Sequence, residues 1–411
     1  MFEFLKRSQS PRPGAEPQQQ GGADRRAQAL RGQPMAEQER ALRPPAPERD
    51  RNQERQSRVM GEAHKIGNQD VVIEQIAHRG ANKAIPGDQL ARWGYREAGA
   101  VNDPESGFRA VLFMPTAEAL AGQTEQAQIA RAIHGGAPPP VLAFRGTQEK
   151  RGLQDDTNRE GVGKYQFESN VGRISQIFAA AGGKAVVAGH SLGGALAQQA
   201  AARFPSLVSR VVTFQAPAVT AEDAEKVDQH NAANADNPED QITSTHYRAS
   251  GDLVHKAGEA LTRGDVYTFE SKGIGNPKDH TQFPLARLAA ARGSMIPGIT
   301  GEGNRPGQDK LVKVRKTDSD RAKSGPMAKI AEGGRKVFGG AIRDKSMEKY
   351  VRVWRDVEAM CQSGQFSESY VQGVVAANKD LKPVQKDKMR DQIRILYANL
   401  PRPQQAEQQG G

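Results

Sequence analysis

Apolar and polar residues alternate along the middle of the chain in a way that predicts strands and helices in turn. Short apolar runs rich in β-branched residues predict buried strands at 108–113, 138–144, 185–188, 210–214, 243–248 and 266–270. Helical spacing or alanine-rich composition predicts helices at 117–133, 166–181 and 194–202. Strands that alternate with helices predict an α/β fold with a mostly parallel central sheet, covered by helices on both faces.

The two ends of the chain have a different pattern. Residues 1–60 are rich in Gln, Pro, Arg, Gly and Ala and have few large apolar side chains, so we expect them to be disordered. Near the other end, two apolar stripes with helical spacing predict helices: Met347, Val351, Trp354 and Val357, then Val384, Met389, Ile393 and Leu396. Residues 367–378 fit a shorter helix between them.

These patterns predict four regions along the chain. They are a disordered segment at 1–60, an α/β domain at 61–300, a small C-terminal helical module at 301–400 and a disordered tail at 401–411. Within the α/β domain, residues 221–241 form a polar insertion, which we interpret as either a lid or a surface loop.

Charge is distributed unevenly over the 411 residues, whose formal net charge is +10. The balance is +4 over residues 1–60, −2 over 61–300 and +8 over 301–411. A nearly neutral centre argues against a nucleic-acid groove in the α/β domain. For residues 305–400 two interpretations stay open: recruitment to an anionic membrane surface or an acidic protein partner, or a solvated helical bundle that covers the α/β domain.

The chain carries one cysteine, Cys361, which excludes an internal disulfide framework and fits a reducing compartment. The first residues lack the apolar core of a secretory signal, and no apolar run reaches the length of a membrane span. We therefore expect a protein that is cytoplasmic in the producing cell. Its polar N-terminal region and Gln-rich tail resemble those of bacterial effectors exported without a Sec signal; the alternative is a cytoplasmic enzyme with irregular ends.

One short motif carries the chemistry of the chain. Gly189-His190-Ser191-Leu192-Gly193 follows an apolar strand and precedes a helix of small residues, which is the context that a G-x-S-x-G nucleophile elbow requires. Such a turn exposes the serine at a helix N-terminus, where free N–H groups favour developing negative charge. We therefore predict that Ser191 is a nucleophile.

A serine nucleophile needs a base to take its proton and an acid to orient that base. Asp252 follows one predicted strand and His280 lies in a loop after the next, which matches the chain order Ser, Asp, His of α/β-hydrolases. His255 is the alternative base and Asp265 the alternative acid, whereas His246 falls inside a strand. His190 is assigned no part in proton transfer.

Three segments together resemble the class 3 lipase family: Phe144-Arg-Gly-Thr147 followed by Asp155-Asp156, the elbow at Gly189–Gly194, and Arg248–Asp252. The resemblance covers roughly residues 100–290. It implies an α/β-hydrolase fold, with a lipase-like domain at residues 61–300. It also implies hydrolysis of the carboxylic esters of acylglycerols or phospholipids.

The resemblance also implies roles for individual residues. The backbone N–H and hydroxyl of Thr147 and the backbone N–H of Leu192 correspond to the family's oxyanion hole, and Asp155 or Asp156 to a carboxylate that supports that loop. Gln215 departs from the family, which has glycine at the corresponding position before Ala-Pro.

Together these patterns predict a serine hydrolase of lipase or phospholipase type that needs no metal or cofactor. Ser191 is its nucleophile, His280 its general base and Asp252 the residue that orients the base. Two alternatives stay open: an acyltransferase with the same three residues, and a non-catalytic protein that acts through its C-terminal helices.

Overall fold

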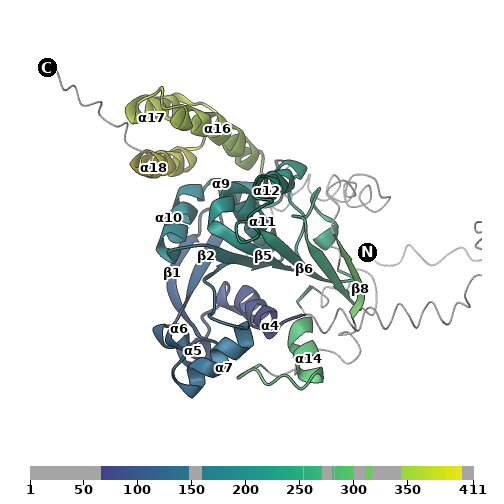
Figure 1. The fold of residues 1–411 in the computed structure, drawn as a ribbon. Coiled ribbons are helices and arrows are strands. Elements are labelled where there is room, and N and C mark those ends of the chain that lie inside the picture. Colours follow the sequence, from purple (N-terminus) through teal and green to yellow (C-terminus); the bar gives the residue numbers. More distant parts are fainter. Residues whose placement is uncertain are drawn as a thin grey trace, which may run out of the picture. The chain divides into compact units, whose positions relative to one another are not determined.

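The structure is a computed structural model that describes residues 66–147, 160–252, 254–270, 280–281, 283–299, 311–316 and 344–399. In these residues eight strands form one sheet whose spatial order follows the chain, β1 to β8. Strands β3 to β7 are parallel, while β1, β2 and β8 pair antiparallel with their neighbours. The prediction of a mostly parallel central sheet is confirmed (Figure 1).

The strands are β1 Tyr95–Asp103, β2 Phe108–Pro115, β3 Val141–Phe144, β4 Ala185–His190, β5 Val208–Phe214, β6 Thr243–Ala249, β7 Asp265–Phe269 and β8 Leu311–Lys316. The six predicted strands correspond to β2–β7. β1 and β8, at the two edges of the sheet, were not predicted. β1 is mostly exposed between its buried ends, so it lacks the apolar run that marks the central strands.

Helices cover both faces of the sheet (Figure 1). On one face lie α9 Lys164–Glu168, α10 Val171–Ala181, α11 Leu192–Arg203 and α12 Ala221–Ala233. The other face carries α4 Asn68–Gln75, the π-helix η1 Ile76–Gly80, α5 Gly87–Arg92, α6 Ala117–Ala121, α7 Glu125–His134 and α14 Pro284–Ala291. Successive residues of β4 join opposite cores: Val187 packs with the first group, and Val186 and Ala188 with the second.

Two segments expected to form single helices are each broken in two. Gly122, with φ 70°, ends α6, and the Thr124 hydroxyl accepts the Ala127 N–H at 3.1 Å to begin α7. In the second segment, Asn170 separates α9 from α10, and its buried side-chain amide donates to Asp103 Oδ2 at 2.9 Å. Local capping and a buried polar contact therefore override the apolar spacing.

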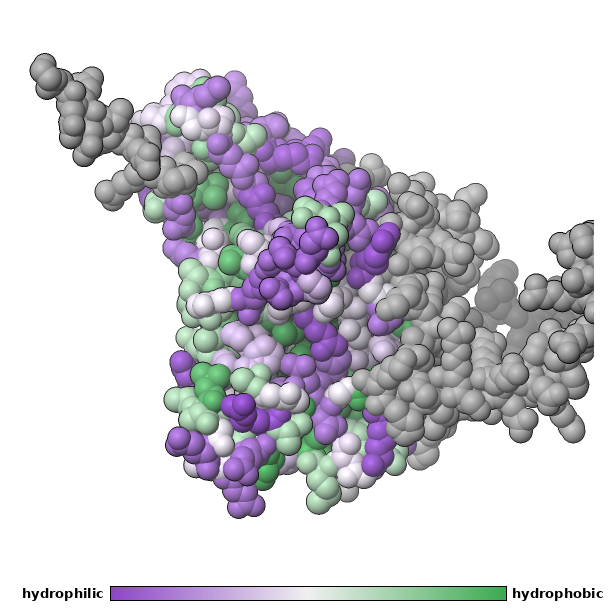
Figure 2. Space-filling model, in the orientation of Figure 1, coloured by the Kyte–Doolittle hydropathy of each residue, from purple (hydrophilic) through white to green (hydrophobic). Residues whose placement is uncertain are grey.

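The polar insertion at 221–241 begins as a helix, α12, whose inner face is packed. Ala224 and Val227 are buried in the core that also contains α11. Thr220 caps the helix by accepting the Asp223 N–H at 3.1 Å. The outer surface over α12 is predominantly hydrophilic in Figure 2. The first part of the insertion is therefore a surface helix rather than an open loop.

The C-terminal helices are α16 Lys345–Gln362, α17 Glu368–Ala377 and α18 Pro383–Asn399, as the apolar stripes predicted. Tyr350 and Trp354 on α16 are fully buried, in the same core as the sheet and α10. The Gly172 N–H of α10 donates to Gln392 Oε1 of α18 at 2.5 Å. The helices thus pack on the α/β domain.

Lys388 of α18 is a second link between the C-terminal helices and the α/β domain. Its side chain is 7% exposed, and its ammonium pairs with Asp103 at 2.6 Å and also contacts Glu105. Burial alone would raise the pKa of Asp103, but the charge of Lys388 and hydrogen bonds lower it below its usual value. The predicted disordered segments at 1–60 and 401–411 lie outside the described residues. Among the helices described, none combines the length and apolar character needed to cross a membrane.

Candidate active site

Ser191 lies at the turn between β4 and α11 with φ 57°, a backbone conformation that non-glycine residues rarely adopt. The turn is possible only with small neighbours. A Cβ at Gly189 would lie 2.1 Å from the Gly193 carbonyl carbon, and a Cβ at Gly193 would lie 2.1 Å from the Phe144 carbonyl oxygen. These contacts explain why the predicted elbow has glycine on both sides of the serine.

The structure brings Ser191, His280 and Asp252 together. His280 Nε2 lies 2.7 Å from Ser191 Oγ, and His280 Nδ1 lies 2.9 Å from Asp252 Oδ2. Asp252 is 3% exposed, and its other oxygen accepts the Val254 N–H at 3.0 Å. A carboxylate accepts the Nδ1–H, which leaves Nε2 free to accept the serine proton. The arrangement can therefore activate the hydroxyl of Ser191.

His246 is bonded to other groups, and Asp265 lies at the other end of the strands. His246, inside β6, is buried and bonds through its two ring nitrogens to Thr213 Oγ1 and the Thr262 carbonyl, each at 2.8 Å. Asp265 begins β7, whereas Ser191 follows the carboxyl end of the parallel strand β4. The two residues therefore lie at opposite ends of the strands. His255 is in the short 3₁₀ turn Val254–Lys256. The Oδ2 oxygen of Asp252 forms its hydrogen bond with His280.

The segment after β3 runs against the elbow. A Cβ at Gly146 would lie 3.3 Å from Ser191 Cβ, so Gly146, the residue before Thr147, lies directly against the serine. Arg145 holds this segment, because its N–H donates to the Arg109 carbonyl at 2.9 Å and its guanidinium donates to the Gly107 carbonyl at 2.8 Å. Leu192 is the first residue of α11, where backbone N–H groups have no carbonyl partner within the helix. Asp155 and Asp156 lie outside the described residues.

Gln215, the departure from the class 3 pattern, occupies a strained position directly after β5. Its φ is 44°, its side chain is fully buried, and its N–H donates to the Tyr247 carbonyl at 2.8 Å. Glycine adopts this left-handed conformation without strain, whereas glutamine does so at a cost of about 1 kcal/mol or more. The backbone conformation at this position therefore favours the glycine that the family has, although this chain carries glutamine.

Two further histidines lie next to the three predicted residues, and the sequence analysis assigns neither of them a functional role. His190 Nε2 lies 2.6 Å from the backbone carbonyl oxygen of His280. The ring of His78, from η1, stacks on the ring of His190 with centroids 3.8 Å apart. A π-helix often marks a functional position, but η1 is invisible in a sequence pattern. The only sequence signal for His78 is its place at the end of an apolar segment.

Both of these histidines are held neutral. Burial, followed by the charge that His280 carries when it is protonated, lowers the pKa of His190 to about 3. Burial and the neighbouring His190, His280 and Arg79 also lower the pKa of His78 well below its usual value.

We expect these histidines to make the fold sensitive to acid. Each has a pKa lower in the folded than in the unfolded chain, so its stabilising contribution is present above pH 6.5 and is lost as pH falls towards its folded pKa. For His190 alone, the linkage relation gives a loss of roughly 2 kcal/mol between pH 7.5 and pH 5. Urea unfolding at the two pH values measures this. The His190→Phe variant should lose less stability than the wild type, and an equal loss would contradict the assignment.

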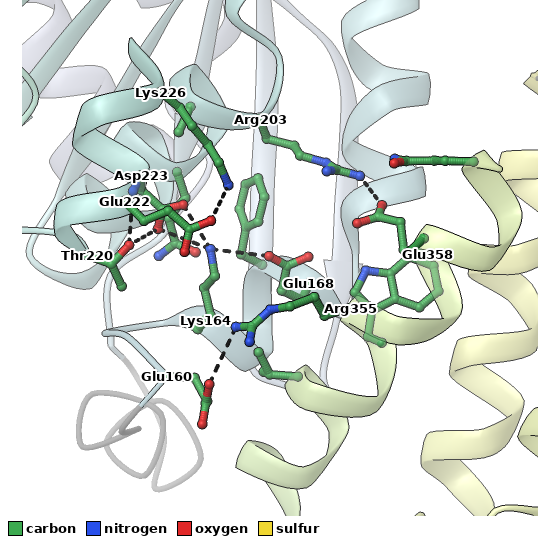
Figure 3. A pocket seen from close by; sticks show the side chains of 17 residues that line it. Glu160, Lys164, Glu168, Arg203, Thr220, Glu222, Asp223, Lys226, Arg355 and Glu358 are labelled. Atoms are coloured by element: carbon green, nitrogen blue, oxygen red, sulfur yellow. Dashed lines mark hydrogen bonds and ion pairs between the residues drawn. The ribbon is translucent and has the colours of Figure 1, made fainter. Parts of the chain in front are cut away.

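A separate cavity of about 320 Å³ lies between α16 and helices α9, α11 and α12 (Figure 3), and none of Ser191, His280 and Asp252 lines it. The charged side chains around it pair with one another. Lys164 pairs with Asp223 at 3.1 Å, and Arg203 of α11 pairs with Glu358 of α16. The pair of Arg203 and Glu358 links α16 to the α/β domain. Within the described residues, no three His, Cys, Asp or Glu side chains are grouped so as to hold a metal ion.

Comparison with known proteins gives one family. The model of a phospholipase-like family described as "Tle-like phospholipase domain" matches residues 69–301, more than half of the chain. A search of the curated proteins finds no match.

Similar solved structures are fungal lipases of low sequence identity. Lipase II from Rhizopus niveus is 15% identical, with 54% of this chain and 83% of that chain covered and a TM-score of 0.33. Lip2 lipase from Yarrowia lipolytica is 14% identical, with 53% of this chain and 83% of that chain covered and a TM-score of 0.34. A triacylglycerol lipase from Penicillium expansum is 12% identical, with 56% of this chain and 90% of that chain covered and a TM-score of 0.30.

Proposed function

Because this chain belongs to the Tle-like phospholipase domain family and is a lipid ester hydrolase of lipase or phospholipase type, we propose that it cleaves phospholipid carboxylic esters at Ser191. The observation that supports this most directly is the continuous hydrogen-bonded chain from Ser191 Oγ through His280 to the buried carboxylate of Asp252, with distances of 2.7 and 2.9 Å.

In the proposed mechanism, Ser191 Oγ attacks the ester carbonyl carbon while its proton moves to His280 Nε2. Asp252 stabilises the imidazolium that forms, and the N–H groups of Leu192 and Thr147 stabilise the negative oxygen of the tetrahedral intermediate. The intermediate expels the alcohol, which takes the proton from His280, and leaves an acyl group on Ser191. Water, activated by the same histidine, then releases the fatty acid.

Substrate class is the first property to test. We expect the purified chain to release fatty acid from diacyl phospholipid in mixed micelles at least about tenfold faster, in kcat/KM, than from a triacylglycerol of the same acyl chains. Fatty-acid release, followed by mass spectrometry with and without an added alcohol acceptor, also separates hydrolysis from acyl transfer. A preference for triacylglycerol would contradict the phospholipase proposal, and acylated alcohol as the main product would favour an acyltransferase.

For the C-terminal helices we propose a stabilising role rather than recruitment to a membrane or an acidic partner. Tyr350 and Trp354, the two aromatic residues of α16, are fully buried and so cannot contact a membrane. Residues 344–399 carry ten Lys and Arg against eight Asp and Glu, so most of the +8 balance of the region 301–411 lies elsewhere in that region. The surface over α16 is hydrophilic in Figure 2.

Export from the producing cell as an effector stays a proposal. It depends on residues 1–60 and on the tail at 401–411, and both segments lie outside the described residues.

A further inference from the structure

We propose that His190 is a positioning residue for the reaction: its ring N–H holds the backbone of His280, and the ring of His78 holds the ring of His190. The inference rests on the proposed roles of Ser191 and His280. It adds to them a reason why the base stays in place, since His280 lies in a connection between β7 and α14 and not within a strand of the sheet.

The hydrogen bond itself fixes the state of His190. A carbonyl oxygen can only accept, so at 2.6 Å from the His280 carbonyl the Nε2 of His190 must carry the proton. His280 is then held at three points: its carbonyl by His190, its Nδ1 by Asp252 and its Nε2 by Ser191. The first of these contacts restrains the backbone, so it sets where the imidazole lies before any proton moves.

The ring of His190 is in turn held by His78. The two rings stack with their centroids 3.8 Å apart and an interplanar angle of 29°. The ring centroid of Phe283, three residues beyond His280, lies 4.3 Å from that of His78. The His190 ring lies 4.8 Å from that of His280. His78 therefore packs between the residue before the nucleophile and the segment that follows the base.

Helix α4 anchors this arrangement to α14. Glu74 of α4 is fully buried, and its two carboxyl oxygens accept the N–H groups of Leu285 and Ala286 at 3.1 Å each. These N–H groups belong to the first turn of α14, which has no carbonyl partners of its own. Helix α4, which continues directly into the η1 turn that carries His78, is thus fixed to the helix that begins just after His280.

The proposal requires that His190 keep a single N–H donor while His280 gains a proton. Its burial and the adjacent charge on His280 meet this requirement, because both lower the pKa of His190, to about 3. The positive charge that forms during the reaction therefore stays on His280, beside Asp252.

Two substitutions separate the hydrogen bond from the ring packing. His190→Gln keeps an N–H near the position of Nε2 but removes the ring, whereas His190→Phe keeps the ring against His78 but removes the donor. We expect His190→Phe to lower kcat about 10- to 100-fold with KM changed less than about threefold, since misplacing a catalytic group by 1 Å costs about this much. His190→Gln should recover most of that loss. Both variants are first checked for unchanged thermal unfolding.

The structures of the two variants provide a second comparison, which does not depend on measuring turnover. Crystal structures of the two variants should show the contact between His280 Nε2 and Ser191 Oγ kept in His190→Gln and lengthened in His190→Phe. Equal kcat and equal geometry in the two variants, or a larger loss in His190→Gln, would overturn the positioning role. If Ser191→Ala retained ester hydrolysis, the proposed function would fail, while the structures would still decide whether His190 holds His280.

Discussion

Replacing Ser191 with alanine is expected to lower kcat for ester hydrolysis by roughly 10⁴- to 10⁶-fold while leaving the fold unchanged. The loss is large because the hydroxyl oxygen is the atom that attacks the substrate, and its proton moves to His280, 2.7 Å away. The fold should survive, because alanine keeps the Cβ and can adopt the same strained φ of 57°. Fatty-acid release and labelling by a fluorophosphonate measure the first effect, and thermal unfolding measures the second. Turnover close to that of the wild type would remove Ser191 from the mechanism.

The base is tested by combining substitutions. His280→Asn should lose about as much activity as Ser191→Ala, and the double variant should be no worse, because the three residues act as a unit. His255→Asn is the matched control, since the structure gives the Oδ2 oxygen of Asp252 to His280. It should change kcat less than about threefold. A large loss in His255→Asn, with little in His280→Asn, would transfer the role of base to His255.

Much of the fold could be predicted because buried parallel strands have a distinctive pattern. β4, for example, is apolar at every position from Ala185 to Ala188, since its two faces meet different cores. The elbow could be predicted for a related reason, because the close approach of Gly189 to Gly193 excludes other residues. Asp252 and His280 could be predicted because each follows a later strand in the chain. In a parallel sheet, this order places them at the carboxyl ends of the strands, where Ser191 lies.

The rest depends on contacts between distant segments. β1 is an exposed edge strand and carries no apolar run. Among the described strands, β8 pairs with β7 alone, although it lies beyond residue 300. His78 is far from His190 in sequence, and only the folding of α4 and η1 against the sheet brings their rings together. No periodicity or motif records such a contact. The break at Asn170 likewise depends on Asp103, on another element.

The C-terminal helices provide the second large effect, now on stability. Trp354 of α16 is fully buried in the core that it shares with the sheet. Replacing it with alanine should lower the free energy of unfolding by about 3–5 kcal/mol, the usual cost of removing a large buried aromatic side chain. Urea denaturation followed by circular dichroism measures this.

Tyr370 on α17 is the matched control, because it is an aromatic residue of the same helices that is 55% exposed. Tyr370→Ala should change the free energy of unfolding by no more than about 0.5 kcal/mol. If α16 were instead a surface for membranes, Trp354→Ala would leave unfolding unchanged and weaken binding to anionic vesicles, and that result would contradict the stabilising role. Removing residues 344–411 extends the test. We expect it to expose the apolar core around Ile174 and Phe178 and to make the α/β domain aggregate, whereas removing only 400–411 should not.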